Sequence, residues 1–146
     1  MDGMLDQIFA FTGVKIAFIK DNQVLVSLRD DLPTIPYPNT WDLPGGGREG
    51  AETPFECVAR EVWEELGLTL TPDYIIWGQI YPSMLEPGKH SVFLVGSISQ
   101  MELESIRFGD EGQGWKMMDL QDFVTDESII PPLRQRVRDY VDYHRD

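Results

Sequence analysis

The chain has 146 residues, of which 42% are hydrophobic and 25% are charged, and its formal net charge is −13. This length suits one domain with a substantial core, so we expect a single domain over residues 1–146. A surface this acidic repels nucleic acid polymers and anionic membranes, which argues against both as partners. No apolar stretch is long enough to cross a bilayer.

The single cysteine, Cys57, excludes a disulfide framework within the chain. This fits a reducing compartment, and we therefore expect a cytoplasmic protein. The first 21 residues lack a basic segment followed by a long apolar run, so we expect no signal peptide.

The first third of the chain predicts a hairpin followed by a loop. Residues 14–20 and 23–29 are β-type runs separated by two turn-forming residues, which predicts paired strands. Residues 30–40 contain three prolines and are predicted to form a loop. Residues 41–47 then predict a short extended piece and a tight glycine turn.

A helix is predicted over residues 54–66. Thr53 can act as its N-cap, Pro54 occupies the first turn, and Glu56 completes a T-x-x-E capping box. Gly67 marks its C-terminus. Apolar residues at helical spacing form one stripe for packing against a core; they are Phe55, Val58, Ala59, Val62 and Leu66.

The second half of the chain predicts further strands and a C-terminal helix. In chain order we expect strand 74–81, turn-rich connection 82–90, strand 91–99, loop 109–114, short strand 115–118 and helical turn 119–123. The tail from residue 131 predicts a helix with Leu133, Val137, Tyr140 and Val141 at helical spacing. A mixed sheet flanked by two helices follows, which is an α/β or α+β sandwich.

Three carboxylates gather on the predicted helix, at Glu61, Glu64 and Glu65. They occupy one arc of roughly 100° beside the apolar stripe, directly after a glycine-rich turn. At a separation of about 6 Å and an effective dielectric of about 20, each pair repels by roughly 3 kcal/mol. A divalent cation reverses that sign, and all-oxygen ligands favour Mg²⁺ or Mn²⁺ over Zn²⁺. The alternative is a solvated acidic face.

The segment from Gly46 to Leu68 resembles a complete Nudix box. The family pattern is G-x5-E-x7-R-E-U-x-E-E-x-G-U, where U is aliphatic, and every specified position matches. The flanking strands and the C-terminal helix also fit the Nudix α/β/α sandwich. The resemblance therefore implies an α/β fold with a mixed sheet between the box helix and a C-terminal helix.

The resemblance also implies a chemistry, the hydrolysis of a nucleoside diphosphate linked to a further group. Glu61, Glu64 and Glu65 would bind Mg²⁺, with Mn²⁺ as the other choice, or position and deprotonate water; Glu61 is our first choice as base. The Gly46 carbonyl would be a further metal ligand.

Three further residues take roles from the same resemblance. Glu52 and Arg60 would hold the geometry of loop and helix. Glu111, in a later loop, resembles an additional metal-binding glutamate of MutT-like members, although a plain loop acid is the alternative.

Four substrate contacts are weaker expectations. Arg29 ends a strand just before the proline loop, and Trp41 precedes the glycine turn and can stack on a base or join the core. His90 opens a strand, and Asp126 lies roughly where MutT-like enzymes read the base. For each residue, a surface or structural role is the alternative.

The leading hypothesis is a MutT-like pyrophosphohydrolase that converts a nucleoside triphosphate, possibly an oxidised one such as 8-oxo-dGTP, to monophosphate and pyrophosphate. The alternative substrates are ADP-ribose, a nucleotide sugar or a dinucleotide polyphosphate. A binding module that senses a nucleotide without turnover is a hypothesis of another class. We expect a small nucleotide as partner, with the choice between monomer and homodimer left open.

Overall fold

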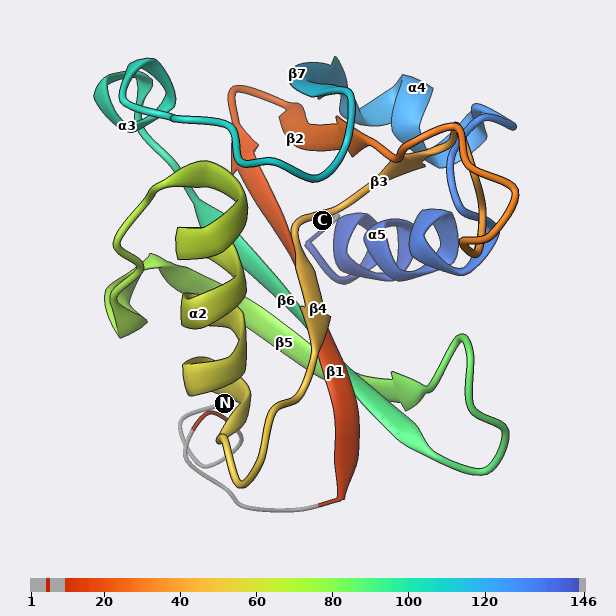
Figure 1. The fold of residues 1–146 in the computed structure, drawn as a ribbon. Helices are drawn as coiled ribbons and strands as arrows, with labels where there is room; N and C mark the ends of the chain where they lie inside the picture. The colour runs from red at the N-terminus through yellow and green to blue at the C-terminus, as the bar shows by residue number, and fades with distance from the viewer. Residues whose placement is uncertain (1–4, 6–9, 145–146) are drawn as a thin grey trace.

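A mixed β-sheet forms the centre of the computed structural model, which describes Leu5 and residues 10–144 (Figure 1). The ends of the expected domain and part of the N-terminal segment, residues 1–4, 6–9 and 145–146, lie outside the described residues. The strands are β1 (Phe11–Lys20), β2 (Gln23–Leu28), β3 (Trp41–Asp42), β4 (Gly45–Gly47), β5 (Ile75–Pro82), β6 (His90–Ser97) and β7 (Gly114–Asp119).

The strands run in the order β3-β2-β1-β6-β5, while β4 pairs with β1 and β7 pairs with β2. The pairing of β1 with β6 is parallel and the other pairings between strands are antiparallel. The helices are α2 (Pro54–Leu66), a 3-10 turn η1 (Pro72–Tyr74), α3 (Gln100–Glu104), α4 (Leu120–Thr125) and α5 (Pro131–Tyr143).

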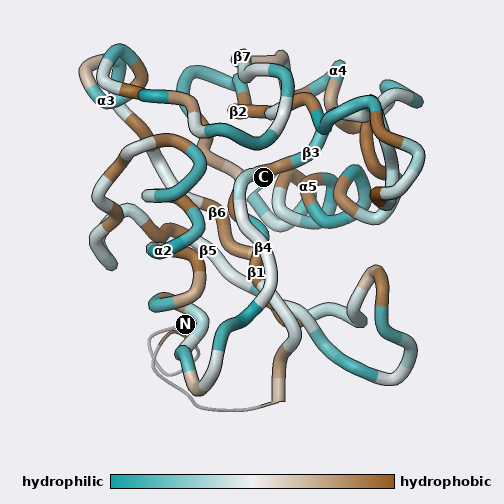
Figure 2. Tube along the Cα trace, in the orientation of Figure 1, coloured by the Kyte–Doolittle hydropathy of each residue, from teal (hydrophilic) through white to brown (hydrophobic). Residues whose placement is uncertain are grey.

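Helices α2 and α5 lie on opposite faces of the sheet, which gives three layers (Figure 1). Alternate residues of β1 serve the two faces: Ile16 and Phe18 pack in the core cluster under α2, while Ala17 packs in the cluster under α5. Strand β6 is buried in the same two-sided way. Figure 2 shows the resulting pattern, with apolar residues along the central strands and polar residues in the outer loops. This is the expected α/β sandwich.

Helix α2 spans the predicted residues 54–66, and the other predicted strands and helices agree to within a few residues. Residues 45–47 differ from prediction, because they form strand β4, paired with β1, rather than a tight turn. The strand predicted at 91–99 ends at Ser97, because Ser99 caps the short helix α3, which was not predicted. The S-x-x-E capping box at its N-terminus is a sequence pattern that indicates a helix start.

Among the described residues, no helix is both long enough and apolar enough to cross a membrane.

Candidate active site

Local signals at both ends of α2 fix the position of its acidic face. The Thr53 hydroxyl accepts from the Glu56 N–H at 3.2 Å, and Glu56 accepts from the Thr53 N–H at 2.8 Å. Gly67 ends the helix in the left-handed region, with φ of 67°. Val58, Val62 and Leu66 are buried, together with Cys57. Packing of that apolar side turns the three glutamates toward β4 and solvent.

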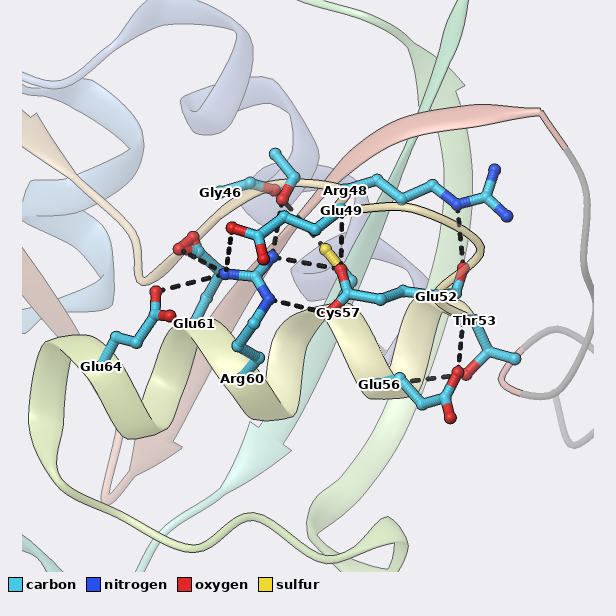
Figure 3. Close-up of polar contacts among 11 residues, drawn as sticks. Gly46, Arg48, Glu49, Glu52, Thr53, Glu56, Cys57, Arg60, Glu61 and Glu64 are labelled. Atoms are coloured by element: carbon cyan, nitrogen blue, oxygen red, sulfur yellow. Dashed lines mark hydrogen bonds and ion pairs between the residues drawn. The ribbon is translucent and has the colours of Figure 1, made fainter.

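Arg60 joins the loop before α2 to the helix (Figure 3). Its Nε donates to Glu52 at 2.7 Å, and its Nη2 donates to Glu52 at 3.1 Å and to the Gly47 carbonyl at 2.8 Å. Its Nη1 lies 3.2 Å from Glu64 and 3.5 Å from Glu61. The bidentate contact raises the pKa of Arg60 and lowers the pKa of Glu52. Arg60 and Glu52 therefore hold the glycine strand against the helix.

Glu65 is the most enclosed of the three glutamates. Its Oε1 accepts from the Gly45 N–H at 2.9 Å. Burial raises its pKa to about 8, because the charged carboxylate has lost much of its hydration, and the nearby charges of Glu61 and Asp42 act in the same direction. Burial therefore disfavours the ionised form of Glu65.

Glu61 lies directly against the glycine strand. A Cβ placed on Gly46 would approach Glu61 Oε2 to 2.1 Å, so no side chain larger than hydrogen fits there without moving the carboxylate. Burial, followed by the charges of Glu64 and Glu111, raises the pKa of Glu61. The bare backbone at Gly46 therefore brings a carboxylate and the main chain into close approach.

Glu111 reaches the same region from a distant part of the chain. The Arg107 N–H and the Gly109 N–H donate to the α2 carbonyls of Leu66 and Glu65, at 2.9 and 2.8 Å. These contacts satisfy carbonyls at the C-terminal end of the helix and bind the loop to it. Glu111 follows two residues after Gly109, and it lines the same cavity as Glu61, Glu64 and Glu65.

That cavity has a volume of about 820 Å³. It is lined by β4 and the four glutamates, by residues from the loops 30–37 and 83–86, and by Arg136 of α5. Pockets of this size accommodate a nucleotide-sized ligand.

A buried ion cluster stands beside the glycine strand and was not expected from the sequence. Asp42, 4% exposed, accepts from Lys15 Nζ at 3.0 Å and from Arg29 Nη1 at 2.9 Å. The Leu43 N–H also donates to it, at 2.7 Å. These residues all line the cavity. Two cations facing one carboxylate leave a net positive charge on this wall, which suits a phosphate.

Of the four expected substrate contacts, Arg29 lines the cavity, whereas Trp41, His90 and Asp126 do not. Trp41 packs against the core under α5 and carries the Lys116 ammonium 4.5 Å from its ring. His90 is exposed on β6, and Asp126 accepts from the Ser128 N–H and hydroxyl at 2.7 Å each. Contact of Trp41, His90 and Asp126 with substrate therefore stays a prediction, and the cavity walls support it for Arg29 alone.

The donor set fits a hard divalent cation. Within residues 5 and 10–144, no three acidic, histidine or cysteine side chains lie close enough together to form a metal cluster. The Gly45 N–H donates to Glu65, and Arg60 pairs with Glu64. All the donors facing the cavity here are oxygens, from Glu61, Glu64, Glu65, Glu111 and the Gly46 backbone. Carboxylate and carbonyl oxygens suit Mg²⁺, Mn²⁺ and Ca²⁺ rather than softer ions.

An α/β/α sandwich with an acidic helix, a bare glycine strand and a cationic wall around one cavity defines a class of protein that handles phosphate-containing small molecules. The family model of the NUDIX domain matches residues 12–140. The chain belongs to the Nudix family, which confirms the resemblance seen in the sequence.

The chain is also similar to three known proteins. It is 33% identical over 103 residues to m7GpppN-mRNA hydrolase NUDT17 from Danio rerio, an alignment that covers 63% of this chain and 34% of the relative. The chain thus spans about a third of that relative's length. The crystal structure of a MutT protein from Methanosarcina mazei Go1 matches with a TM-score of 0.72 at 22% identity, over 97% of this chain and 99% of the other.

The third relative is a bifunctional NMN adenylyltransferase/ADP ribose pyrophosphatase from Francisella tularensis, complexed with AMP and a Mn ion. It matches with a TM-score of 0.72 at 18% identity, over 94% of this chain and 43% of the other. At these identities the two structural matches establish the fold of the chain, and its substrate has to be argued from its own cavity.

Proposed function

We propose that this chain is a Mg²⁺-dependent Nudix pyrophosphohydrolase that cleaves a nucleoside triphosphate to the monophosphate and pyrophosphate. The observation that carries the proposal is that four glutamates and the bare Gly46 backbone line one nucleotide-sized cavity. The Mn ion and AMP in the Francisella tularensis relative support a divalent cation and a nucleotide. The net charge of −13 supports a small nucleotide rather than a nucleic acid polymer.

A bound Mg²⁺ would be held by Glu61, Glu64, Glu65, Glu111 and the Gly46 carbonyl, and would supply charge neutralisation for the phosphates. Glu61 holds the attacking water and accepts its proton as the water oxygen bonds to phosphorus and the anhydride P–O bond breaks. Lys15 and Arg29 orient the phosphates from the wall beside the glycine strand. Arg60 and Glu52 position the glutamates without touching substrate.

Glu61→Gln tests this assignment. The amide keeps the shape of the side chain but can neither accept the proton nor carry the charge, so kcat should fall at least about 1,000-fold. Glu104→Gln makes the same chemical change at an exposed residue of α3 and should act like the wild type. Product chromatography should yield monophosphate and pyrophosphate from triphosphates in the presence of Mg²⁺. Equal activity of Glu61→Gln and the wild type would contradict the assignment.

A second candidate is a substrate in which the diphosphate joins a nucleoside to another group, such as ADP-ribose, a nucleotide sugar or a dinucleotide polyphosphate. Two similar proteins, an m7GpppN-mRNA hydrolase and an ADP ribose pyrophosphatase, favour including it. The same chromatography decides, because cleavage of these compounds in preference to triphosphates would replace the leading assignment while keeping the acidic site. Nucleotide binding without any turnover would instead indicate a sensing module.

A further inference from the structure

The far end of the cavity holds a buried arginine that forms no ion pair with any carboxylate of the described residues. Arg136 of α5 is 3% exposed; its Nη2 donates to the Pro82 carbonyl at 2.8 Å, and its guanidinium lies 4.8 Å from the centre of the Tyr81 ring. Its Nη1 has no hydrogen-bond acceptor among the described residues. A buried donor left in that state costs free energy.

A second buried polar group beside Arg136 also has no hydrogen-bond partner. Ser91 of β6 is 9% exposed, and its hydroxyl has no hydrogen-bond partner in the part of the chain that the structure describes. Ser91 lies opposite Tyr81 in the antiparallel pairing of β5 and β6, so both side chains project from the face that α5 covers. Because Arg136 covers Tyr81, the two unpartnered groups flank one ring, and both line the cavity.

The distance from the acidic end suits the opposite end of a nucleotide. Val14 of β1 lies opposite Gly46 on one side and opposite Val92, the neighbour of Ser91, on the other. Two strand spacings, about 10 Å in total, therefore separate the glycine strand from β6. A sugar joined to a phosphate chain spans such a distance, which leaves the base beside Ser91 and Arg136.

The walls at this end favour a flat base over another phosphate. Loop residues 30–37 and 83–86 contribute mainly apolar side chains, which are Leu32, Ile35, Pro36, Tyr37, Met84 and Leu85. The charged side chains from these loops are the carboxylates of Asp30 and Glu86, which repel an anion. The loops lie on the α5 side of the molecule (Figure 1).

We propose that Arg136 and Ser91 form a base-reading subsite that selects a purine with a ring carbonyl, of the guanine type, over adenine. This rests on the proposed function, because it names the base of the nucleotide cleaved at the acidic end. Guanine presents acceptors at O6 and N7, which suit an arginine donor and a hydroxyl. Adenine presents an amino donor in place of O6, which would leave the Arg136 donor facing a donor of the base.

Binding of products in the absence of metal tests the subsite apart from catalysis. Isothermal titration with GMP and AMP should give at least about 10-fold tighter binding of GMP to the wild type. Arg136→Met keeps the apolar stem and should reduce this preference to near one, and Ser91→Ala should reduce it partly. Arg134→Met removes the same charge from the same helix outside the cavity and should keep the wild-type preference.

Three results would overturn the subsite. The first is equal binding of GMP and AMP to the wild type, and the second is an unchanged preference for GMP in both Ser91→Ala and a folded Arg136→Met. The third is displacement of bound GMP by ribose 5-phosphate as strongly as by GMP itself. The last would identify a phosphate site. Should Arg136→Met not fold, Ser91→Ala decides alone, because the unpartnered hydroxyl contributes no hydrogen bond to the fold.

The same variants separate this inference from the proposed function. In Mg²⁺, kcat/KM for GTP should exceed that for ATP in the wild type, and Arg136→Met should lower the ratio by at least about 10-fold. Selective GMP binding without hydrolysis of any nucleotide would refute the enzyme and keep the subsite. Hydrolysis with equal kcat/KM for GTP and ATP would refute the subsite and keep the enzyme.

Discussion

At the scale of single residues, Gly46 determines where the Glu61 carboxylate can stand. A Cβ at Gly46 would lie 2.1 Å from Glu61 Oε2, whereas one at Gly47 would meet only the Thr12 carbonyl, at 3.9 Å. The clash at Gly46 is with the free end of a side chain, which can move. The glycine therefore protects the geometry of the site more than the stability of the fold.

Gly46→Ala should accordingly lower kcat by about 100-fold, since a displacement of about 1 Å at a reacting group has that effect. The midpoint of thermal unfolding should change by only a few degrees. Gly47→Ala, the adjacent substitution with room for the methyl group, should lose much less activity. Steady-state kinetics and thermal melts of both variants make the comparison, and equal losses would argue against the role of Gly46.

Cys57 is fully buried on the core side of α2, and burial raises its pKa from 9.0 to about 12. Between these values the unfolded chain releases a proton that the native protein keeps, so the native state loses stability as the pH rises. The free energy of unfolding should therefore fall from pH 9 toward pH 11 more steeply in the wild type than in Cys57→Ala. Urea titrations at several pH values measure the two slopes.

At the scale of elements, Arg60 couples the loop after β4 to helix α2. Its guanidinium contacts the Gly47 carbonyl and the carboxylates of Glu52, Glu61 and Glu64. Lysine carries the same charge but lacks the planar fork that makes these contacts together. The position of the loop after β4 against helix α2 should therefore depend on the shape of the guanidinium as well as on its charge.

Arg60→Lys should therefore weaken Mg²⁺ binding by about 10- to 100-fold, as loss of a residue that orients metal ligands does. Lys20→Arg, a change at an exposed ion pair on the hairpin, serves as the control. Titration calorimetry with MgCl₂ on both variants and the wild type gives the affinities. An unchanged affinity in Arg60→Lys would show that charge alone suffices.

At the scale of the whole molecule, the site gathers four carboxylates around one cavity, and Arg60 and Lys15 offset their charge only in part. Burial and neighbouring carboxylates raise the pKa values of Glu61 and Glu65, which means that their ionised forms are unfavourable in the native state without a cation. A ligand that binds only the native state stabilises it in proportion to its concentration over its dissociation constant.

Saturating Mg²⁺ should therefore raise the unfolding temperature of the wild type by several degrees, corresponding to about 3 kcal/mol at 100 times the dissociation constant. Excess EDTA should reverse the rise, and Glu61→Gln should reduce it. Scanning calorimetry in MgCl₂ and in KCl of equal ionic strength separates specific binding from screening. An equal rise in both salts would argue against a metal site.

Much of the fold and the acidic half of the site could be predicted from the sequence, because their signals are local. Thr53 and Glu56 mark the start of α2 and Gly67 marks its end, and helical geometry alone puts Glu61, Glu64 and Glu65 on one arc. Strand β4 was harder to predict, since nothing in three glycines indicates pairing, and it forms because β1 offers an edge.

Sequence by itself determined the helix with its acidic face and the family, and it predicts an oxygen-ligated cation there. Tertiary structure alone decided which other residues share the cavity with the acidic face. Lys15 meets Asp42 from 27 positions away and Arg136 meets Pro82 from 54 positions away. Such contacts depend on strand order, register and the packing of α5, which arise from many weak interactions summed over the whole chain. For that reason, no local sequence pattern indicated that Ser91 or Arg136 lines the cavity, and none argued against it.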